Sequence, residues 1–186
     1  MKVKKIAMTV SGLSLFSMLG MVHARQSDSA SWCTSHNGRV ETMVVQYELG
    51  GGIVNGLKKK FCNFKEKDGS TAFVGLEAYG SKRPSLAATM LLRLTMDKKK
   101  PLPTKPFGDP ATNVCKKLGG SNVSYYVVEG GFTDHAGTAG ICTFGDGSMI
   151  DAWSLIYTAI GFNANIKKTI RSKPLQIKIP DPQTER

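Results

Sequence analysis

The chain has 186 residues, with 25 Lys and Arg against 14 Asp and Glu, 41% hydrophobic residues and four cysteines. Charged residues make up 21% of the sequence, a balance that is typical of a globular protein and argues against a disordered chain. The longest apolar run is too short to cross a bilayer, so we expect no transmembrane helix.

Residues 1–24 have the three parts of a secretory signal peptide. Lys2, Lys4 and Lys5 give a positive start, an apolar segment follows over residues 6–21, and Val22-His23-Ala24 forms a small-residue cleavage site. An uncleaved anchor helix is the alternative. We predict export and removal of residues 1–24, which leaves a formal charge of +8 because three lysines are lost from a total of +11. The sequence leaves open whether the protein stays in the periplasm or is secreted.

Four cysteines remain in residues 25–186, and an even number in an exported protein favours two disulfide bonds over a metal site. The cysteines lack the C-x-x-C clustering of zinc sites, and no calcium-binding loop is present, so we predict neither a metal nor a cofactor. We favour the pairs Cys33–Cys62 and Cys115–Cys142, because each would join the first helix of a repeat to its returning strand. The two other pairings remain possible.

An internal repeat is the main clue to the architecture. The run W-C-T-S-H-N-G-R-V from Trp32 and the run F-C-N-F-K-E-K-D-G-S from Phe61 return as V-C-K-K-L-G-G-S-N-V from Val114 and I-C-T-F-G-D-G-S from Ile141. We therefore predict a first repeat unit over residues 25–97 and a second over residues 109–186. A basic, proline-rich linker over residues 98–108 joins them.

The strands expected in each repeat unit form a hairpin. Val- and Tyr-rich residues separated by glycines predict strands over 39–49 and 53–64 in the first unit, and over 122–129 and 139–144 in the second. A third, alternating stretch closes each unit, at residues 92–96 and 175–179.

Helices are expected before and after each hairpin. Asp109 is a good N-cap and Pro110 suits the first helical position, so a helix is predicted over residues 110–118. After the D-G-S turn, Met149, Trp153, Ile156 and Ile160 recur with helical spacing and predict a face that packs on the core. The predicted fold class is thus α+β, with two tandem units of helix, strand, strand, helix and strand, each forming a small antiparallel sheet with packed helices.

Two segments of the second unit resemble a known family. D-P-A-T-N-V-C-K-K-L-G-G from Asp109 and G-I-C-T-F-G-D-G-S-M-I-D-A-W from Gly140 are similar to the small exported bacterial proteins labelled haemolysins, the domain of unknown function 333. Members carry further cysteines after D-G-S and beyond the Trp, whereas this chain has Ile150 at the first of these places, so the family's cysteine pairing cannot be transferred. The resemblance implies an exported, α+β, non-enzymatic protein.

No catalytic residue is predicted. The histidines that remain in residues 25–186, His36 and His135, lie in polar, glycine-rich surroundings, oxidised cysteines cannot act as nucleophiles, and no G-x-S-x-G motif is present. Asp68 and Asp146, each in a D-G-S sequence, could be paired carboxylates. We interpret them instead as turn and helix-cap residues.

Positive charge is the feature most indicative of a partner. An exported protein with this charge is attracted to anionic surfaces. We expect it to bind phospholipid headgroups, an acidic glycan or an acidic protein. Binding to such a partner on a host would give it a role in virulence. Nucleic acid fits less well, because no aromatic residues are interleaved with the lysines. The predicted binding residues are Lys58, Lys59, Lys60, Lys65, Lys67, Lys98, Lys99, Lys100, Lys167, Lys168, Arg171 and Lys173.

Three other interpretations stay open. The lysines can form a solvated face that only keeps the protein soluble. A secreted inhibitor or toxin-like protein acting on another protein is the second, and a hydrolase without a recognisable motif is the third.

Overall fold

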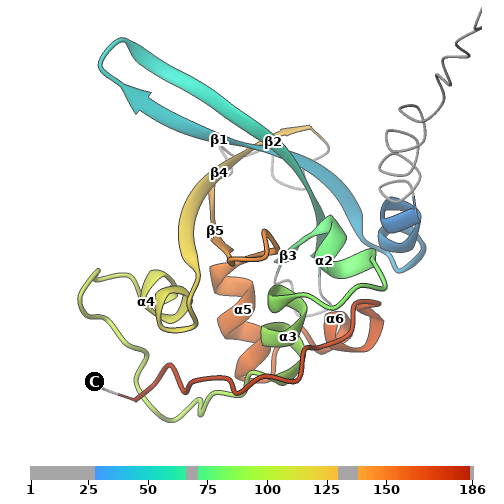
Figure 1. Cartoon of the computed structure of the whole chain (residues 1–186), viewed down its shortest axis with the longest axis vertical. Helices are drawn as coiled ribbons and strands as arrows, with labels where there is room; N and C mark the ends of the chain where they lie inside the picture. The colour runs from blue at the N-terminus through green and yellow to red at the C-terminus, as the bar shows by residue number, and fades with distance from the viewer. Residues whose placement is uncertain (1–27, 66–70, 130–137, 185–186) are drawn as a thin grey trace, which may run out of the picture.

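The structure, a computed structural model, describes residues 28–65, 71–129 and 138–184. Its centre is one closed antiparallel barrel of six strands, with helices gathered around one end (Figure 1). The strands follow the order β1-β2-β3-β6-β5-β4, and β4 pairs with β1 to close the barrel. Their bounds are β1 Arg39–Leu49, β2 Gly52–Lys65, β3 Thr71–Gly75, β4 Ser121–Glu129, β5 Thr138–Thr143 and β6 Met149–Asp151.

Both halves of the chain have the same order of elements: a helix, three strands and two helices. The first half has a helical segment over residues 28–35, and the second half begins with a helix in the same place. The predicted hairpin strands are confirmed to within one residue at each end. The remaining helices are α2 Leu76–Gly80 and α3 Leu86–Arg93 in the first half, and α4 Pro110–Lys117, α5 Ala152–Ala159 and α6 Ala164–Thr169 in the second.

The prediction of two separate small sheets is wrong. A three-stranded sheet on its own leaves two edges with unpaired backbone N–H and C=O groups. Here the edges of the two halves pair with each other: β1 pairs with β4 from Thr42 to Val45, and β3 pairs with β6 at Val74 and Ile150. The two halves therefore share one sheet.

The predicted closing strands are also wrong. Residues 92–96 begin in the last turn of α3, which Ser85 caps by accepting a hydrogen bond from the Ala88 N–H, and residues 175–179 form no strand. The third strand of each half is instead β3 or β6, directly after the D-G-S region. These strands have only five and three residues, too few for alternation to reveal them.

The core face predicted for the helix after Ser148 is confirmed at Ile156 and Ile160, but it is wrong at Trp153 and in where the helix starts. Met149 belongs to β6, and α5 starts only at Ala152, capped by the Asp151 carboxylate, which accepts from the Ser154 N–H. This start places Leu155 and Ile156 in the core and leaves Trp153 38% exposed.

Two clusters of buried side chains hold the fold together. The barrel interior is filled by side chains that include Met43, Phe61, Tyr125 and Ile141. The larger cluster lies between the outside of the barrel and the helices, and it contains both disulfide bonds.

The disulfide bonds are Cys33–Cys62 and Cys115–Cys142, which confirms the favoured pairing. They close loops with sequence separations of 29 and 27, each worth about 3.5 kcal/mol in the chain-entropy view. Disulfide bonds indicate an oxidising, exported compartment. Among the described residues, no helix is both long and apolar enough to cross a bilayer.

A glycine packs directly against each disulfide. The N–H of Gly38 donates to the Cys33 carbonyl at 2.9 Å, and the N–H of Gly120 donates to the Cys115 carbonyl at the same distance. A Cβ atom on either glycine would lie 2.5 Å from the nearer sulfur, of Cys62 or Cys142. Only glycine lets the chain pass so close to the disulfide.

We predict that Gly38→Ala and Gly120→Ala each lower the free energy of unfolding by about 1–3 kcal/mol, because the new methyl group overpacks the disulfide. Gly145→Ala is the matched control, since its Cβ would meet nothing within 4 Å, and its stability should stay equal or rise slightly. Urea unfolding of the oxidised protein measures all three. A Gly120→Ala variant as stable as the parent would show that this close approach is not a constraint.

Candidate functional site

The lysines at residues 58–60 lie where strand β2 loses one of its two neighbours. β2 pairs with β1 along most of its length, and Lys60 faces Thr42 there, but β2 pairs with β3 only from Phe61 onward. The reason is that β3 ends at Gly75, where the chain turns into α2. The edge of β2 at these lysines is therefore open.

A pocket of about 430 Å³ lies at this open edge. Its walls are β2, the first residues of α2 and the turn between β5 and β6. The lysines contribute the basic side of the pocket, and Glu77 is its one acidic residue. The residues that define this lysine pocket are Lys58, Lys59, Lys60, Glu77, Ser148 and Met149.

The three lysines of the lysine pocket have no ion-pair partner in the described part of the chain. All three lysines are exposed, and none forms a side-chain hydrogen bond or ion pair with another described residue. By contrast, a pocket of about 670 Å³ beside α4 also contains lysines, but Lys117 donates to the Thr184 carbonyl and Lys116 lies 4.4 Å above the Phe107 ring. The second pocket thus keeps one unengaged lysine, Lys178, together with the acidic Asp181, whereas the first has three unengaged lysines.

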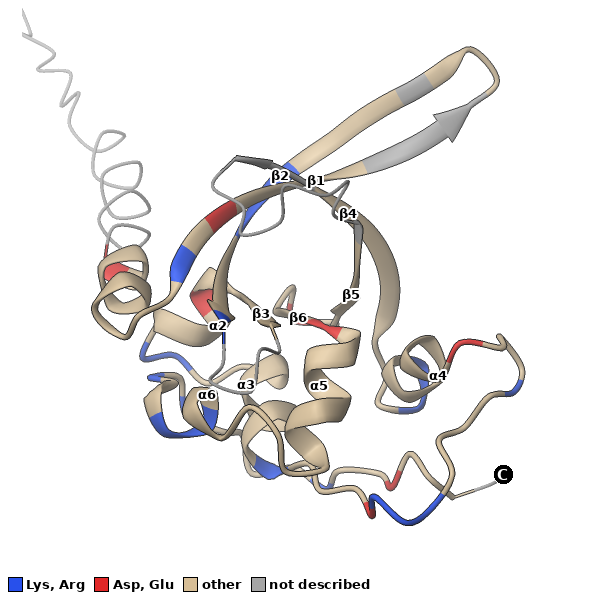
Figure 2. Cartoon of the chain, turned by 180° about the vertical axis from the view of Figure 1, so that it is seen from behind, with Lys and Arg blue, Asp and Glu red and all other residues tan. Residues whose placement is uncertain are grey.

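The other predicted basic residues do not join the lysine pocket. Figure 2 shows basic residues at the base of the β1–β2 hairpin, on α4 and α6 and along the loops below the barrel. Lys65, Lys98, Lys99, Lys168 and Lys173 are exposed on these surfaces. Lys100 lines a smaller pocket with two acidic residues, Asp97 and Asp181, and burial lowers the pKa of the half-buried Lys167. Lys67 lies outside the described residues.

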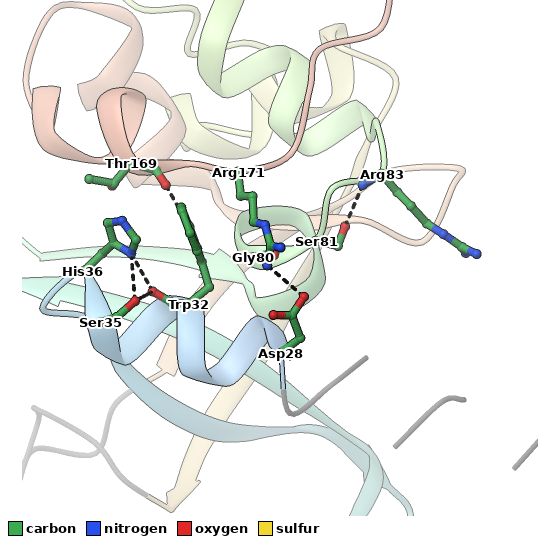
Figure 3. Close-up of polar contacts among 9 residues, drawn as sticks. All are labelled: Asp28, Trp32, Ser35, His36, Gly80, Ser81, Arg83, Thr169 and Arg171. Atoms are coloured by element: carbon green, nitrogen blue, oxygen red, sulfur yellow. Dashed lines mark hydrogen bonds and ion pairs between the residues drawn. The ribbon is translucent and has the colours of Figure 1, made fainter. Parts of the chain in front are cut away.

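Arg171 links the helical segment 28–35 to the end of α6 (Figure 3). Its guanidinium donates to the Asp28 carboxylate at 2.8 Å and lies 4.9 Å from the Trp32 ring, while the Trp32 indole donates to the Thr169 carbonyl at 2.9 Å. These contacts fix the helical segment 28–35 against the end of α6.

The D-G-S sequence at residues 146–148 is a turn and a helix cap, as predicted for this copy. Asp146 accepts hydrogen bonds from the Ser148 hydroxyl at 2.6 Å and from the Leu86 N–H at 2.7 Å, and Ser148 accepts from the Ala87 N–H at 2.8 Å. The capped helix is α3 of the first half, not the helix that follows in sequence. Asp68 lies outside the described residues.

These bonds change the titration of the Asp146 carboxyl. Partial desolvation would raise its pKa, but the bonds from Ser148 and Leu86 together outweigh desolvation and hold the pKa below its ordinary value. The Ser148 hydroxyl is equally committed to structure, so neither group is available as an acid, base or nucleophile.

His36 has no catalytic arrangement around it. Its ring stacks on Trp32 with centroids 4.1 Å apart, and Nδ1 lies 2.8 Å from the Trp32 carbonyl and 3.1 Å from the Ser35 hydroxyl (Figure 3). Within the described part of the chain, no carboxylate contacts it. His135 lies outside that part.

The sequence did not predict two features of the structure, the position of Glu77 and the exposure of three aromatic side chains. Glu77 faces the lysines only because the barrel brings the start of α2 to β2, and no local pattern signals this. Trp153, Tyr157 and Phe162 are exposed although the helical spacing placed Trp153 in the core. The aromatic pair at i and i+4 was the one available signal.

No known protein family, curated protein or solved structure matches this chain. The resemblance to the exported haemolysin-labelled proteins therefore stays a prediction.

We predict that Asp146→Asn destabilises the protein by about 1 kcal/mol through loss of the α3 cap. Because the folded pKa is lowered, the carboxylate adds stability above the pKa of the unfolded chain, and this stability is lost as pH falls through the folded value. Urea midpoints measured from neutral to acidic pH should fall less steeply for Asp146→Asn than for the parent. An Asp146→Asn variant whose midpoints fall as steeply as those of the parent would contradict this role of the Asp146 carboxylate.

Proposed function

We propose that this is an exported, non-enzymatic binding protein that engages an anionic partner through the lysine pocket, with phospholipid headgroups as the first candidate. The observation that carries this proposal is that three lysines without an ion pair among the described residues line one pocket. Successive side chains of a strand point to opposite faces, so Lys58 and Lys60 would approach an anion from one side of the β2 edge and Lys59 from the other. The anion is attracted by this excess of positive charge, and no existing ion pair among the described residues has to break.

The neighbouring hairpin supports a binding role. Beyond Val45, β1 no longer pairs with β4, so the tip of the β1–β2 hairpin is a two-stranded arm that projects from the barrel (Figure 1). The arm carries exposed apolar side chains, with Val54 49% and Leu57 76% exposed. Leu57 directly precedes the three lysines, so an apolar contact and a cationic contact lie side by side.

A lysine-replacement pair tests the proposal. In Lys58→Gln/Lys59→Gln/Lys60→Gln, we expect binding of residues 25–186 to vesicles containing phosphatidylglycerol to fall on the order of a hundredfold at low salt. Lys98→Gln/Lys99→Gln/Lys100→Gln removes the same charge from the linker and should lose much less. Co-sedimentation with vesicles at rising salt measures both.

Three results would contradict the proposal. One is equal loss in the two triple variants, which would mean that only net charge matters. A second is equal retention on pure phosphatidylcholine. A third is binding that does not weaken as salt rises, because contacts between exposed charges are screened by salt. If heparin competes with the vesicles for the parent but not for the pocket variant, the site accepts acidic glycans as well.

The projecting arm also favours a second candidate, an inhibitor that blocks another protein. A two-stranded hairpin is marginally stable in water, and a partner that covers Leu57 would stabilise it. An enzyme purified from envelope or host extract on the immobilised protein should then lose activity when the protein is added, and Leu57→Asp should restore that activity. Inhibition that is the same with Leu57→Asp would exclude the arm as the blocking element.

A further inference from the structure

Three exposed aromatic side chains form a continuous cluster at helix α5. The Trp153 and Tyr157 rings are stacked, with centroids 5.7 Å apart and planes inclined by 29°, and the Phe162 ring meets Tyr157 edge-on at 6.2 Å. Trp153 and Tyr157 are each 38% exposed, and Phe162 is 51% exposed. We call these three residues the aromatic platform.

The backbone holds the platform in place. α5 ends in a Schellman motif: Gly161 has a φ of 103°, its N–H donates to the Thr158 carbonyl, and the Phe162 N–H donates to the Tyr157 carbonyl at 2.8 Å. This motif commonly brings the side chains at the positions of Phe162 and Tyr157 together. It explains why the rings meet, and it means that a ligand would find them already ordered.

Two polar groups on the platform are available to a ligand. The Trp153 indole N–H and the Tyr157 hydroxyl form no hydrogen bond with another described residue. The contrast is Trp32, whose indole donates to the Thr169 carbonyl. Rings that pair an apolar face with a free donor are suited to a ligand that is apolar on one side and polar at its rim.

The internal repeat shows that the platform is not required by the fold. Val74 and Ile150 are equivalent, because they pair with Cys62 and Cys142 in the same register. The third residue after each of these is Glu77 in the first half and Trp153 in the second, so Trp153 occupies the position equivalent to Glu77. The counterparts of Lys58, Lys59 and Lys60 are Thr138, Ala139 and Gly140. Where the first half has a charged pocket, the second half therefore has uncharged and aromatic residues.

The chemistry of the platform narrows the class of ligand. α5 and the turn after it, residues 152–163, contain no charged residue, so nothing there selects an ion. Trp153 and Tyr157 are too close to admit a cation or a base between them. Trp153 and Tyr157 are each 38% exposed, so most of each residue is covered and little of it is left to insert into a bilayer.

From these observations we propose that the aromatic platform binds uncharged sugar rings of a glycan. The C–H groups on one face of a pyranose are weakly positive and stack on the negative face of an aromatic ring, while its hydroxyls can bond to the indole N–H and the phenol. Trp153 and Tyr157 stack on each other and Phe162 meets Tyr157 edge-on, so a sugar ring would stack on one outer ring face while the other rings contact its rim. This site is separate from the lysine pocket and does not depend on it.

The test titrates residues 25–186 with neutral hexasaccharides (cellohexaose, maltohexaose, xylohexaose and chitohexaose) and follows tryptophan fluorescence and heat. Saturable binding of at least one is expected, unchanged by salt and by the triple replacement of Lys58, Lys59 and Lys60. The absence of a salt effect separates this site from the proposed function.

Matched variants assign the site. Phe162→Ala and Trp153→Ala should weaken binding about tenfold or more, whereas Phe107→Ala, which removes a ring of the same 51% exposure elsewhere, should leave it unchanged. Tyr157→Phe removes one hydroxyl that forms no hydrogen bond with another described residue, and it should weaken binding about fivefold through the lost hydrogen bond to the sugar.

Several results would overturn the inference. These are no saturable binding of any hexasaccharide, equal losses in Phe107→Ala and Phe162→Ala, or an unchanged affinity in Tyr157→Phe together with Trp153→Ala. Binding to phosphatidylcholine vesicles that requires Trp153, in place of sugar binding, would identify the platform as a membrane contact.

Discussion

Pairing between the two halves of the chain is the constraint on which the rest of the structure depends. Each half supplies three strands and would leave two open edges, and the β1–β4 and β3–β6 pairs join these edges into one barrel. The β1–β2 arm and the edge of β2 at the lysines stay open. Closure fixes where β3 and β6 end, and thus where α2 and α5 begin. The lysine pocket and the aromatic platform both lie where a short strand gives way to a helix, so both positions follow from the same closure.

The two disulfide bonds lie at equivalent positions in the two halves of the chain. Each joins the helix that precedes the three strands of its half to the second of those strands. Each also packs on a glycine whose place no residue with a Cβ atom could take without a clash. The two halves are therefore alike in their disulfide bonds and in the glycines that pack on them. It differs at its surface, where Glu77 and three lysines on one side correspond to Trp153 and uncharged residues on the other. A repeat that keeps its packing and changes its exposed residues presents two chemically different surfaces on one barrel.

Much of the local structure was predictable because its signals are local. Asp109 and Pro110 marked the start of α4, Gly50 and Gly51 marked the turn of the first hairpin, and the β-rich runs marked four strands. Periodicity failed at α5, whose sequence A-W-S-L-I-Y-T-A is apolar on more than one face, so spacing alone could not decide which face is buried. It failed again at β3 and β6, because three to five residues hold too little alternation to identify a strand.

The sequence by itself determined the repeat, the hairpin strands and the excess of positive charge, and it favoured the disulfide pairs that the structure contains, since each depends on residues near in sequence or on spacing that the repeat reproduces. Only the tertiary structure decided that the halves share one barrel, that Lys58, Lys59 and Lys60 surround a pocket facing Glu77, and that Trp153 is exposed. The physical reason is that these features depend on which strand edges meet, and edges separated by some eighty residues pair through backbone groups that every residue carries.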